Sequence, residues 1–174
     1  MGFFSLLSVP KLQDQLHTNK TPILQTNLEV RKTILNLEQQ IRAFYDSTNQ
    51  TPPEYPVSHY FAPGMYGREL FVPKGTIVVA KIHKHTHLAI LLQGHVTVAT
   101  EEGIVDYVAP VIMVSKAGTK RAAYIHEDTR WVTIHCTTST DLDIIEEEVI
   151  AKTYEEFDSF TQTIVHKLVD YVNP

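Results

Sequence analysis

Three histidines at alternate positions, His83, His85 and His87, are the residues of this sequence best suited to chemistry. They directly precede the apolar run 88–92 and the turn at Gly94. Alternate residues of a β-strand point to one face, and neutral imidazole is the commonest protein ligand for divalent transition metals. The run therefore predicts a metal site inside a β-structure; the alternative is a polar barrel mouth that binds nothing. Because three such residues span about 13 Å along an extended strand, all three can hold one ion only where the strand bends.

Two histidines elsewhere in the chain are further candidates. His126 follows the β-rich run 122–125, and His135 lies within the run 131–136. By alternation, the apolar Val132 lies on the face opposite to His135 and on the same face as Cys136. If Val132 faces the core, His135 points outward and the Cys136 thiol is buried. His126 is therefore the better outside candidate for the metal. The alternative for both histidines is a structural role with hydrogen-bonded rings.

A cluster of charged residues lies close to the predicted turns and offers a ligand-binding group. Arg121 follows the turn at Gly118, and its planar guanidinium can hold a carboxylate or phosphate through two hydrogen bonds while a metal holds another oxygen. Arg121 and His135 are thus the candidates for binding a ligand in the pocket. Ion pairing at the rim of the barrel is the alternative.

The elements that must position these side chains are mainly β-strands. From residue 69 onward, short β-rich runs alternate with turns that carry Gly75, Gly94, Gly103 or Gly118. The runs cover residues 70–72, 76–82, 88–92, 96–100, 105–108, 111–114, 122–125 and 131–136. Such spacing is typical of an antiparallel sandwich or barrel, which we expect over residues 69–150.

Amphipathic helices flank the predicted barrel. Residues 28–46 carry apolar side chains at steps of four and three, which predicts a helix that lies on its own barrel; a coiled coil with a partner is the alternative. Residues 47–68 form a proline-rich linker, and residues 1–27 an apolar tail that docks on its own fold or on a partner. Residues 151–174 form a C-terminal helix whose apolar stripe must be covered. Two such helices beside one barrel favour a homo-oligomer.

Composition narrows the class of protein. A chain of 174 residues fits one domain with appended elements, and a formal net charge of −5 gives no sign of nucleic-acid binding. The single cysteine, Cys136, forms no disulfide within the chain, and the apolar start is too short to span a membrane and lacks the basic region of a signal peptide. We therefore expect no membrane partner and no secretion. Motifs of nucleotide-binding, zincin and hydrolase sites are missing.

The histidine run and its glycine turn resemble the cupin family. Its first motif combines a glycine, His-x-His, a glutamate and a closing glycine; Gly94 fits the closing glycine, and the glutamate position falls on His87. Its second motif, Pro-x-Gly-x-x-His, is matched only by Gly118, and Arg121 stands in the histidine position. Arginine has no lone pair to give a metal. The resemblance implies a jelly-roll β-barrel and a divalent transition metal, iron, manganese, nickel or zinc. We expect His83, His85 and His87 to supply two or three of its ligands, with His126 the best candidate from outside the run.

A second resemblance is to small cupin-like proteins encoded by tailed bacteriophages and prophages. The segments 58–64, 68–70, 118–121 and 126–129 with Trp131 carry it. It implies a viral origin, with the protein in the host cytoplasm or in the virion, and other phage structural proteins among its partners.

Two functions follow as hypotheses. The first is a phage-type interaction or structural module, homo-oligomeric and virion-associated, with a degenerate histidine-rich metal site. The alternative is a metal-dependent cupin enzyme, an oxygenase, isomerase or epimerase acting on a small polar molecule. A small-molecule sensor would share the same pocket, and fold alone does not separate it from the enzyme.

Overall fold

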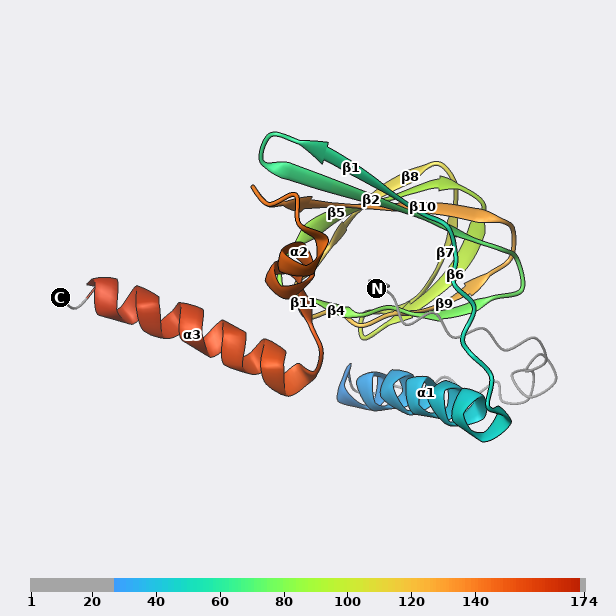
Figure 1. The fold of residues 1–174 in the computed structure, drawn as a ribbon. Coiled ribbons are helices and arrows are strands. Elements are labelled where there is room, and N and C mark those ends of the chain that lie inside the picture. Colours follow the sequence, from blue (N-terminus) through green and yellow to red (C-terminus); the bar gives the residue numbers. More distant parts are fainter. Residues whose placement is uncertain (1–26, 173–174) are drawn as a thin grey trace.

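The computed structural model describes residues 27–172, with side chains for residues 28–165, as two facing antiparallel sheets with helices at both ends (Figure 1). The helices are α1 (Asn27–Thr48), α2 (Leu142–Val149) and α3 (Tyr154–Val172). The strands are β1 (Val57–Ala62), β2 (Met65–Val72), β3 (Ile77–Val79), β4 (Ile82–His83), β5 (His87–Gln93), β6 (His95–Thr100), β7 (Gly103–Val108), β8 (Val111–Ser115), β9 (Ala122–Ile125), β10 (Thr129–Cys136) and β11 (Ile150–Ala151).

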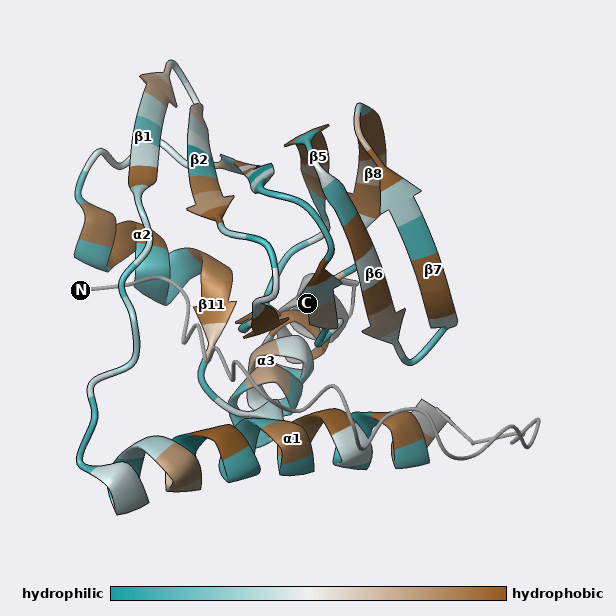
Figure 2. Ribbon diagram, turned by 90° about the vertical axis from the view of Figure 1, so that its right-hand side faces the viewer, coloured by the Kyte–Doolittle hydropathy of each residue, from teal (hydrophilic) through white to brown (hydrophobic). Residues whose placement is uncertain are grey.

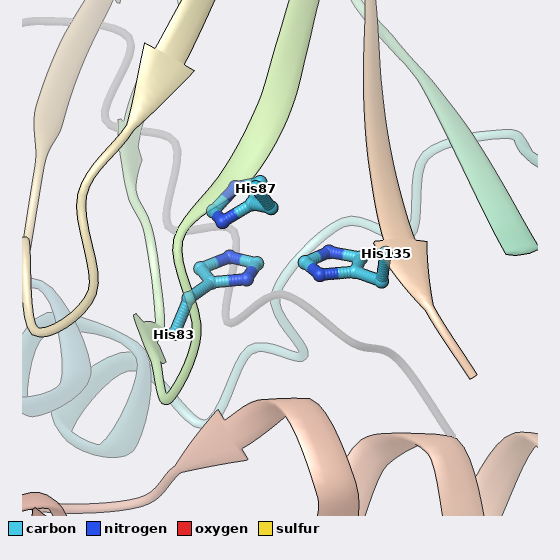
Figure 3. Close-up of side chains that lie close together, drawn as sticks. All are labelled: His83, His87 and His135. Atoms are coloured by element: carbon cyan, nitrogen blue, oxygen red, sulfur yellow. The ribbon is translucent and has the colours of Figure 1, made fainter.

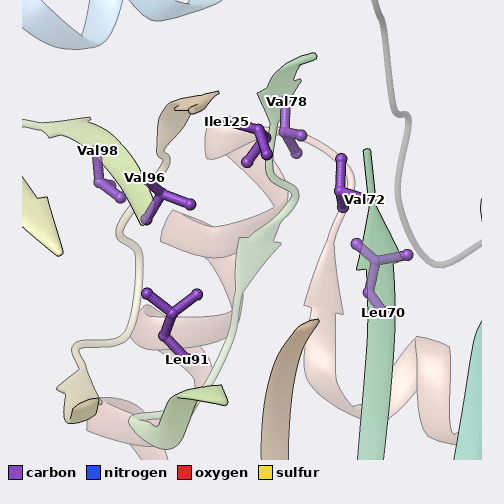
Figure 4. Packing of buried hydrophobic residues seen from close by; sticks show 7 residues of the cluster. All are labelled: Leu70, Val72, Val78, Leu91, Val96, Val98 and Ile125. Carbon is purple, nitrogen blue, oxygen red and sulfur yellow. The ribbon is translucent and has the colours of Figure 1, made fainter. Parts of the chain in front are cut away.

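The two sheets enclose the main core between them. The larger sheet has the order β1-β2-β10-β5-β8, the smaller has β3-β9-β6-β7, and β11 pairs with β4. Apolar side chains from both sheets meet inside, as Figure 4 shows. The cluster consists of Leu70, Val72, Val78, Leu91, Val96, Val98 and Ile125. Each contributing strand alternates, so that the residues between these positions face outward.

Every β-rich run expected from the sequence overlaps a strand of the structure. Two elements lie where no regular structure was expected. The hairpin β1–β2 begins at Val57, inside the stretch 47–68 that was expected to be linker, and α2 lies within residues 69–150. Within 47–68 the last proline is Pro63, in the turn between the two strands, and Tyr60 and Phe61, which favour β-structure, pair with β2 despite the prolines around them. Asp141 caps α2 by accepting hydrogen bonds from two backbone amides.

Helix α1 lies along the outside of the smaller sheet (Figure 2). Its buried Ile34 and Ile41 pack with Val79 of β3. The buried ammonium of Lys120 lies 2.8 Å from the carboxylate of Glu38 and fixes the helix in register. The helix therefore covers its own barrel, as the spacing of its apolar residues predicted.

Helix α3 packs only at its beginning. Tyr154 is buried with Ile82, and Phe157 packs against them. Beyond that turn α3 extends away from the barrel (Figure 1), and the side chains of Ile164 and Val165 are exposed. Within residues 154–165 the apolar stripe is therefore covered only in part. The expected tail, residues 1–27, lies outside the described residues except for Asn27.

No helix among the described residues is both long and apolar enough to cross a membrane.

Candidate metal centre

Three buried histidines come together at one end of the barrel. His83 ends β4, His87 begins β5, and His135 lies near the end of β10. Between β4 and β5 the chain bends, and backbone bonds hold the bend: the amide of Gly118 donates to the carbonyl oxygen of His83 at 2.9 Å, and the amide of Lys84 donates to that of Val149 at 2.8 Å. An extended strand would hold His83 and His87 about 13 Å apart. The bend brings both to one centre.

The three imidazoles face one another (Figure 3). Ring centroids lie 4.2 Å apart for His83 and His87, 4.5 Å for His87 and His135, and 5.0 Å for His83 and His135. One nitrogen of each ring lies within 4.8 Å of the nitrogens of the other two. Nitrogen ligands about 2.0–2.1 Å from a zinc ion are about 3.3 Å apart, so small side-chain rotations would bring the three onto one ion.

Burial keeps these imidazoles neutral. Their exposed fractions are 5% for His83, 6% for His87 and 4% for His135. Removal from water lowers the pKa of His87 to about 4 and that of His135 to about 3, and it holds the pKa of His83 well below the usual value. Neutral rings keep the lone pair that a metal requires.

The hydrogen bonds determine which nitrogen carries that lone pair. Nδ1 of His87 lies 3.1 Å from the carbonyl oxygen of His85, which can only accept, so Nδ1 donates and Nε2 holds the lone pair. That Nε2 is buried and has no hydrogen-bond partner, and the same is true of Nδ1 of His83. Buried polar atoms without a partner cost free energy, and a bound cation would satisfy both. The residues present therefore fit a divalent transition metal.

A small cavity adjoins the triad. Its volume is about 60 Å³, room for about two water molecules or a fragment of similar size. The polar residues His83, His87, Arg121, Thr129 and Thr133 line part of it, and the remaining lining residues are apolar. Those walls are formed by Leu70, Val72, Val78, Ala80, Val98, Ala123, Ile125 and Trp131.

Arg121 brings a half-buried positive charge to this cavity. Its Nη2 donates to Oγ of Ser115 at 2.7 Å, and Ser115 pairs with His87 in the sheet. No carboxylate of the described residues forms an ion pair with it. After burial, the charge of Arg121 contributes to the lowered pKa of both His83 and His87. A half-buried guanidinium that no described carboxylate pairs with is suited to bind an anion.

The other expected ligands lie elsewhere. His85 is exposed at the bend, and its ring stands edge-on to Phe160 at 5.2 Å. His126 is exposed and lies with His95 and Asp106, away from the triad. Side chains at the outside of a bend point away from the centre that the bend creates, and His126 follows the inward-facing Ile125, so it faces outward.

The orientation of β10 is the reverse of the expected one. His135 and Thr133 are buried inside the barrel, whereas Cys136 is exposed. Alternation fixes which residues share a face but not which face is inside. Trp131 settles it here, because it pairs with Leu91 and lines the cavity. One inverted face thus accounts for both differences from expectation, at His135 and at Cys136.

Sequence reasoning did not include His95 and Asp106. Pairing β6 with β7 around the turn at Gly103 places Thr97 opposite Asp106 and His95 opposite Val108. The register of the hairpin around Gly103 could have predicted that His95 and Asp106 lie close together, because strands were expected on both sides of this glycine.

The fold is similar to that of solved structures at low sequence identity, and several of these are cupin-domain proteins. Ectoine synthase from P. lautus is 12% identical, with a TM-score of 0.46 over 56% of this chain and 74% of that chain. KdgF from Halomonas sp. is 15% identical, with a TM-score of 0.42 over 49% of this chain and 82% of that chain. A cupin-2 domain protein from Shewanella frigidimarina is 12% identical, with a TM-score of 0.41 over 54% of this chain and 92% of that chain.

No protein-family model matches the chain, and neither does any curated protein. The fold class rests on the strands themselves, which form two facing antiparallel sheets of the jelly-roll kind with a helix before and a helix after them. The chain is thus a mainly β protein, an antiparallel jelly-roll barrel with N-terminal and C-terminal helices, the fold class expected from its sequence.

Proposed function

We propose that this protein holds a divalent transition metal at His83, His87 and His135 and acts there on a small molecule. The observation that carries the proposal is the pair of unpartnered ring nitrogens, Nδ1 of His83 and Nε2 of His87, in a group of buried neutral imidazoles. Three histidine ligands leave coordination positions open, which is typical of catalytic rather than structural metal sites.

When bound, the metal supplies a Lewis acid that polarises an oxygen of the substrate. Arg121 receives an anionic group of the substrate, since it lines the same cavity and its guanidinium has, among the described residues, the Ser115 hydroxyl as its one hydrogen-bond partner. The apolar walls around Leu70, Val98 and Ile125 exclude water and accept an apolar part of the substrate. Nδ1 of His87 stays protonated toward the carbonyl oxygen of His85, which holds that ring in place.

The size and lining of the cavity define the substrate class. A volume of about 60 Å³ admits a fragment of a few heavy atoms. We therefore propose that the substrate is a very small organic carboxylate, held between the triad and Arg121. We therefore favour the enzyme hypothesis over the structural one, with the chemistry confined to small anionic molecules.

The first test is metal analysis of the untagged protein beside two matched variants. We expect near-stoichiometric iron, manganese, nickel or zinc in the wild type, retained in His85→Ala and lost in His87→Ala. His85→Ala is the control because it removes an exposed histidine of the same run. Equal metal in all three proteins, or none in the wild type after growth with each metal, would refute the proposal.

A second candidate function is an interaction module that assembles with copies of itself, as the phage-like segments suggest. Its support is the exposed apolar outer face of β8, where Ile112 is 68% and Val114 is 66% exposed. We expect a defined oligomer in sedimentation that dissociates in the double variant Ile112→Lys, Val114→Lys. A wild type that stays monomeric at high concentration would remove this candidate.

A further inference from the structure

A second group of metal-ligating side chains lies on the outer face of the smaller sheet. His95 begins β6, Asp106 lies in β7, and His126 directly follows β9. Val96, next to His95, is fully buried, and Ile125, next to His126, is 2% exposed, so both histidines project to the opposite face. The three side chains therefore lie outside the barrel, separated from the cavity by the sheet.

The sheet register brings these three residues together. The backbone amide of His126 donates to the carbonyl oxygen of His95 at 2.9 Å, so the two histidines are cross-strand neighbours. Their rings stack with centroids 4.3 Å apart. Asp106 pairs with Thr97, two residues along β6 on the same face as His95. His95 and Asp106 thus lie in strands, and His126 directly follows one, so strand backbone rather than a loop positions all three side chains.

The side chains are already directed toward one another. Nε2 of His95 lies 3.9 Å from Oδ1 of Asp106. The hydroxyl of Thr97 donates to Asp106 and lies 2.6 Å from Nε2 of His126. One ligand atom from each of the three residues lies within 4.8 Å of the other two. Thr97 consequently holds two of the three groups in position before any ion arrives.

We infer that His95, Asp106 and His126 form a second metal site, open to solvent, for a divalent ion of the zinc, copper or nickel type. Two imidazoles and one carboxylate match the ligand preference of these ions and not that of magnesium or calcium, which take oxygen ligands. His126 and Asp106 are exposed, so the remaining coordination positions face water. Exchange at this site should be fast and its affinity lower than at a buried site.

This inference does not depend on the proposed function. The triad uses His83, His87 and His135, and no residue is shared between the two groups. Variants in one group therefore leave the other intact, and each site can fail separately.

The test is a calorimetric titration with Zn²⁺. It compares the chelator-treated full-length protein with the variants His126→Gln and Asp106→Asn. Beside any binding at the triad, we expect the wild type to show a class of Zn²⁺ sites whose affinity each variant lowers by about tenfold or more, because each variant removes one ligand of three. The same class should persist in His135→Ala. Co²⁺ should give a visible absorption band that His126→Gln reduces.

The matched control is His85→Gln, which removes an exposed histidine outside both groups. It should bind Zn²⁺ at the second site as the wild type does. The inference is overturned if His126→Gln and Asp106→Asn bind Zn²⁺ like the wild type, or if His85→Gln weakens binding as much as they do. If the triad binds no metal, the wild type should still show the Zn²⁺ site that His126→Gln weakens, and the second site then stands without the proposed function. Far-UV circular dichroism confirms that the variants are folded; both replaced side chains are exposed.

Discussion

The two histidine groups of this protein use the same side chain in opposite surroundings. The triad lies inside the barrel beside an apolar cavity, with three imidazoles and two ring nitrogens that lack a partner. The outer group lies in water, and the Thr97 hydroxyl already joins its carboxylate to one of its rings. Burial makes a ligand-free triad costly, whereas solvent and hydrogen bonds satisfy the outer group without an ion. The buried group is therefore poised for tight binding and the outer group for reversible binding.

The largest expected effect that separates the two groups is the pH dependence of stability. Folding lowers the pKa of His87 to about 4 and of His135 to about 3, and that of His83 falls well below 6.5, so the unfolded chain binds protons that the folded chain does not. Stability of the metal-free protein is then complete above the unfolded pKa and is lost as pH falls toward the folded values. Between pH 7.5 and 5.5 we expect a loss of about 1.4 kcal/mol per histidine, or about 4 kcal/mol for the triad.

Urea unfolding of chelator-treated protein at several pH values measures this loss. His135→Phe should reduce the slope by about one third. His126→Gln, in the outer group, is the matched control. A slope that His126→Gln reduces as much as His135→Phe would remove the distinction between the groups.

The second expected effect concerns metal affinity at the triad. His87→Ala removes one ligand and should weaken binding by more than about 100-fold, since loss even of an outer-shell partner costs up to that factor. Competition with a coloured chelator measures it. Asp106→Asn, which changes only the outer group, should retain the triad's affinity; a comparable fall in that variant would show that one ion is shared.

The third expected effect concerns Gly94, in the turn that joins β5, which carries His87, to β6, which carries His95. Gly94 has φ +98°, and a Cβ there would lie 2.8 Å from the carbonyl oxygen of Asp128. Gly94→Ala should cost about 2–3 kcal/mol of unfolding free energy and weaken metal binding at both groups. Gly75→Ala, at φ +80° with no atom within 4 Å, should cost only about 1 kcal/mol. Thermal unfolding of the two variants compares them, and equal losses would mean that the close approach to Asp128 is unimportant.

The smallest expected effect sharpens the role of the cavity. Arg121→Met keeps an unbranched, flexible stem but removes the charge, so binding of acetate near the triad should weaken about tenfold. The shift of the unfolding midpoint with acetate concentration measures this. Arg42→Met, on the exposed face of α1, is the control. An unchanged acetate effect in Arg121→Met would exclude Arg121 from anion binding.

Local patterns predicted the elements well and the histidine partners poorly. Each β-rich run coincides with a strand, and the apolar spacing of residues 28–46 gave the buried face of α1, because alternation and helical periodicity are properties of neighbouring residues. Of the hairpin β1–β2, the sequence predicted only the end of β2, because the prolines before and within the hairpin are typical of a linker.

The sequence by itself determined that the chain is a β-barrel with helices at both ends, that glycines turn its strands, and that histidines could hold a metal. Only the tertiary structure decided which histidines meet. His85 and His87 are near neighbours in the sequence, yet the bend between β4 and β5 turns one out and one in. His135 joins His83 because β10 lies beside β5 with Trp131 facing inward. Alternation fixes relative faces, and only the packing of the two sheets on a shared core chooses the inner one.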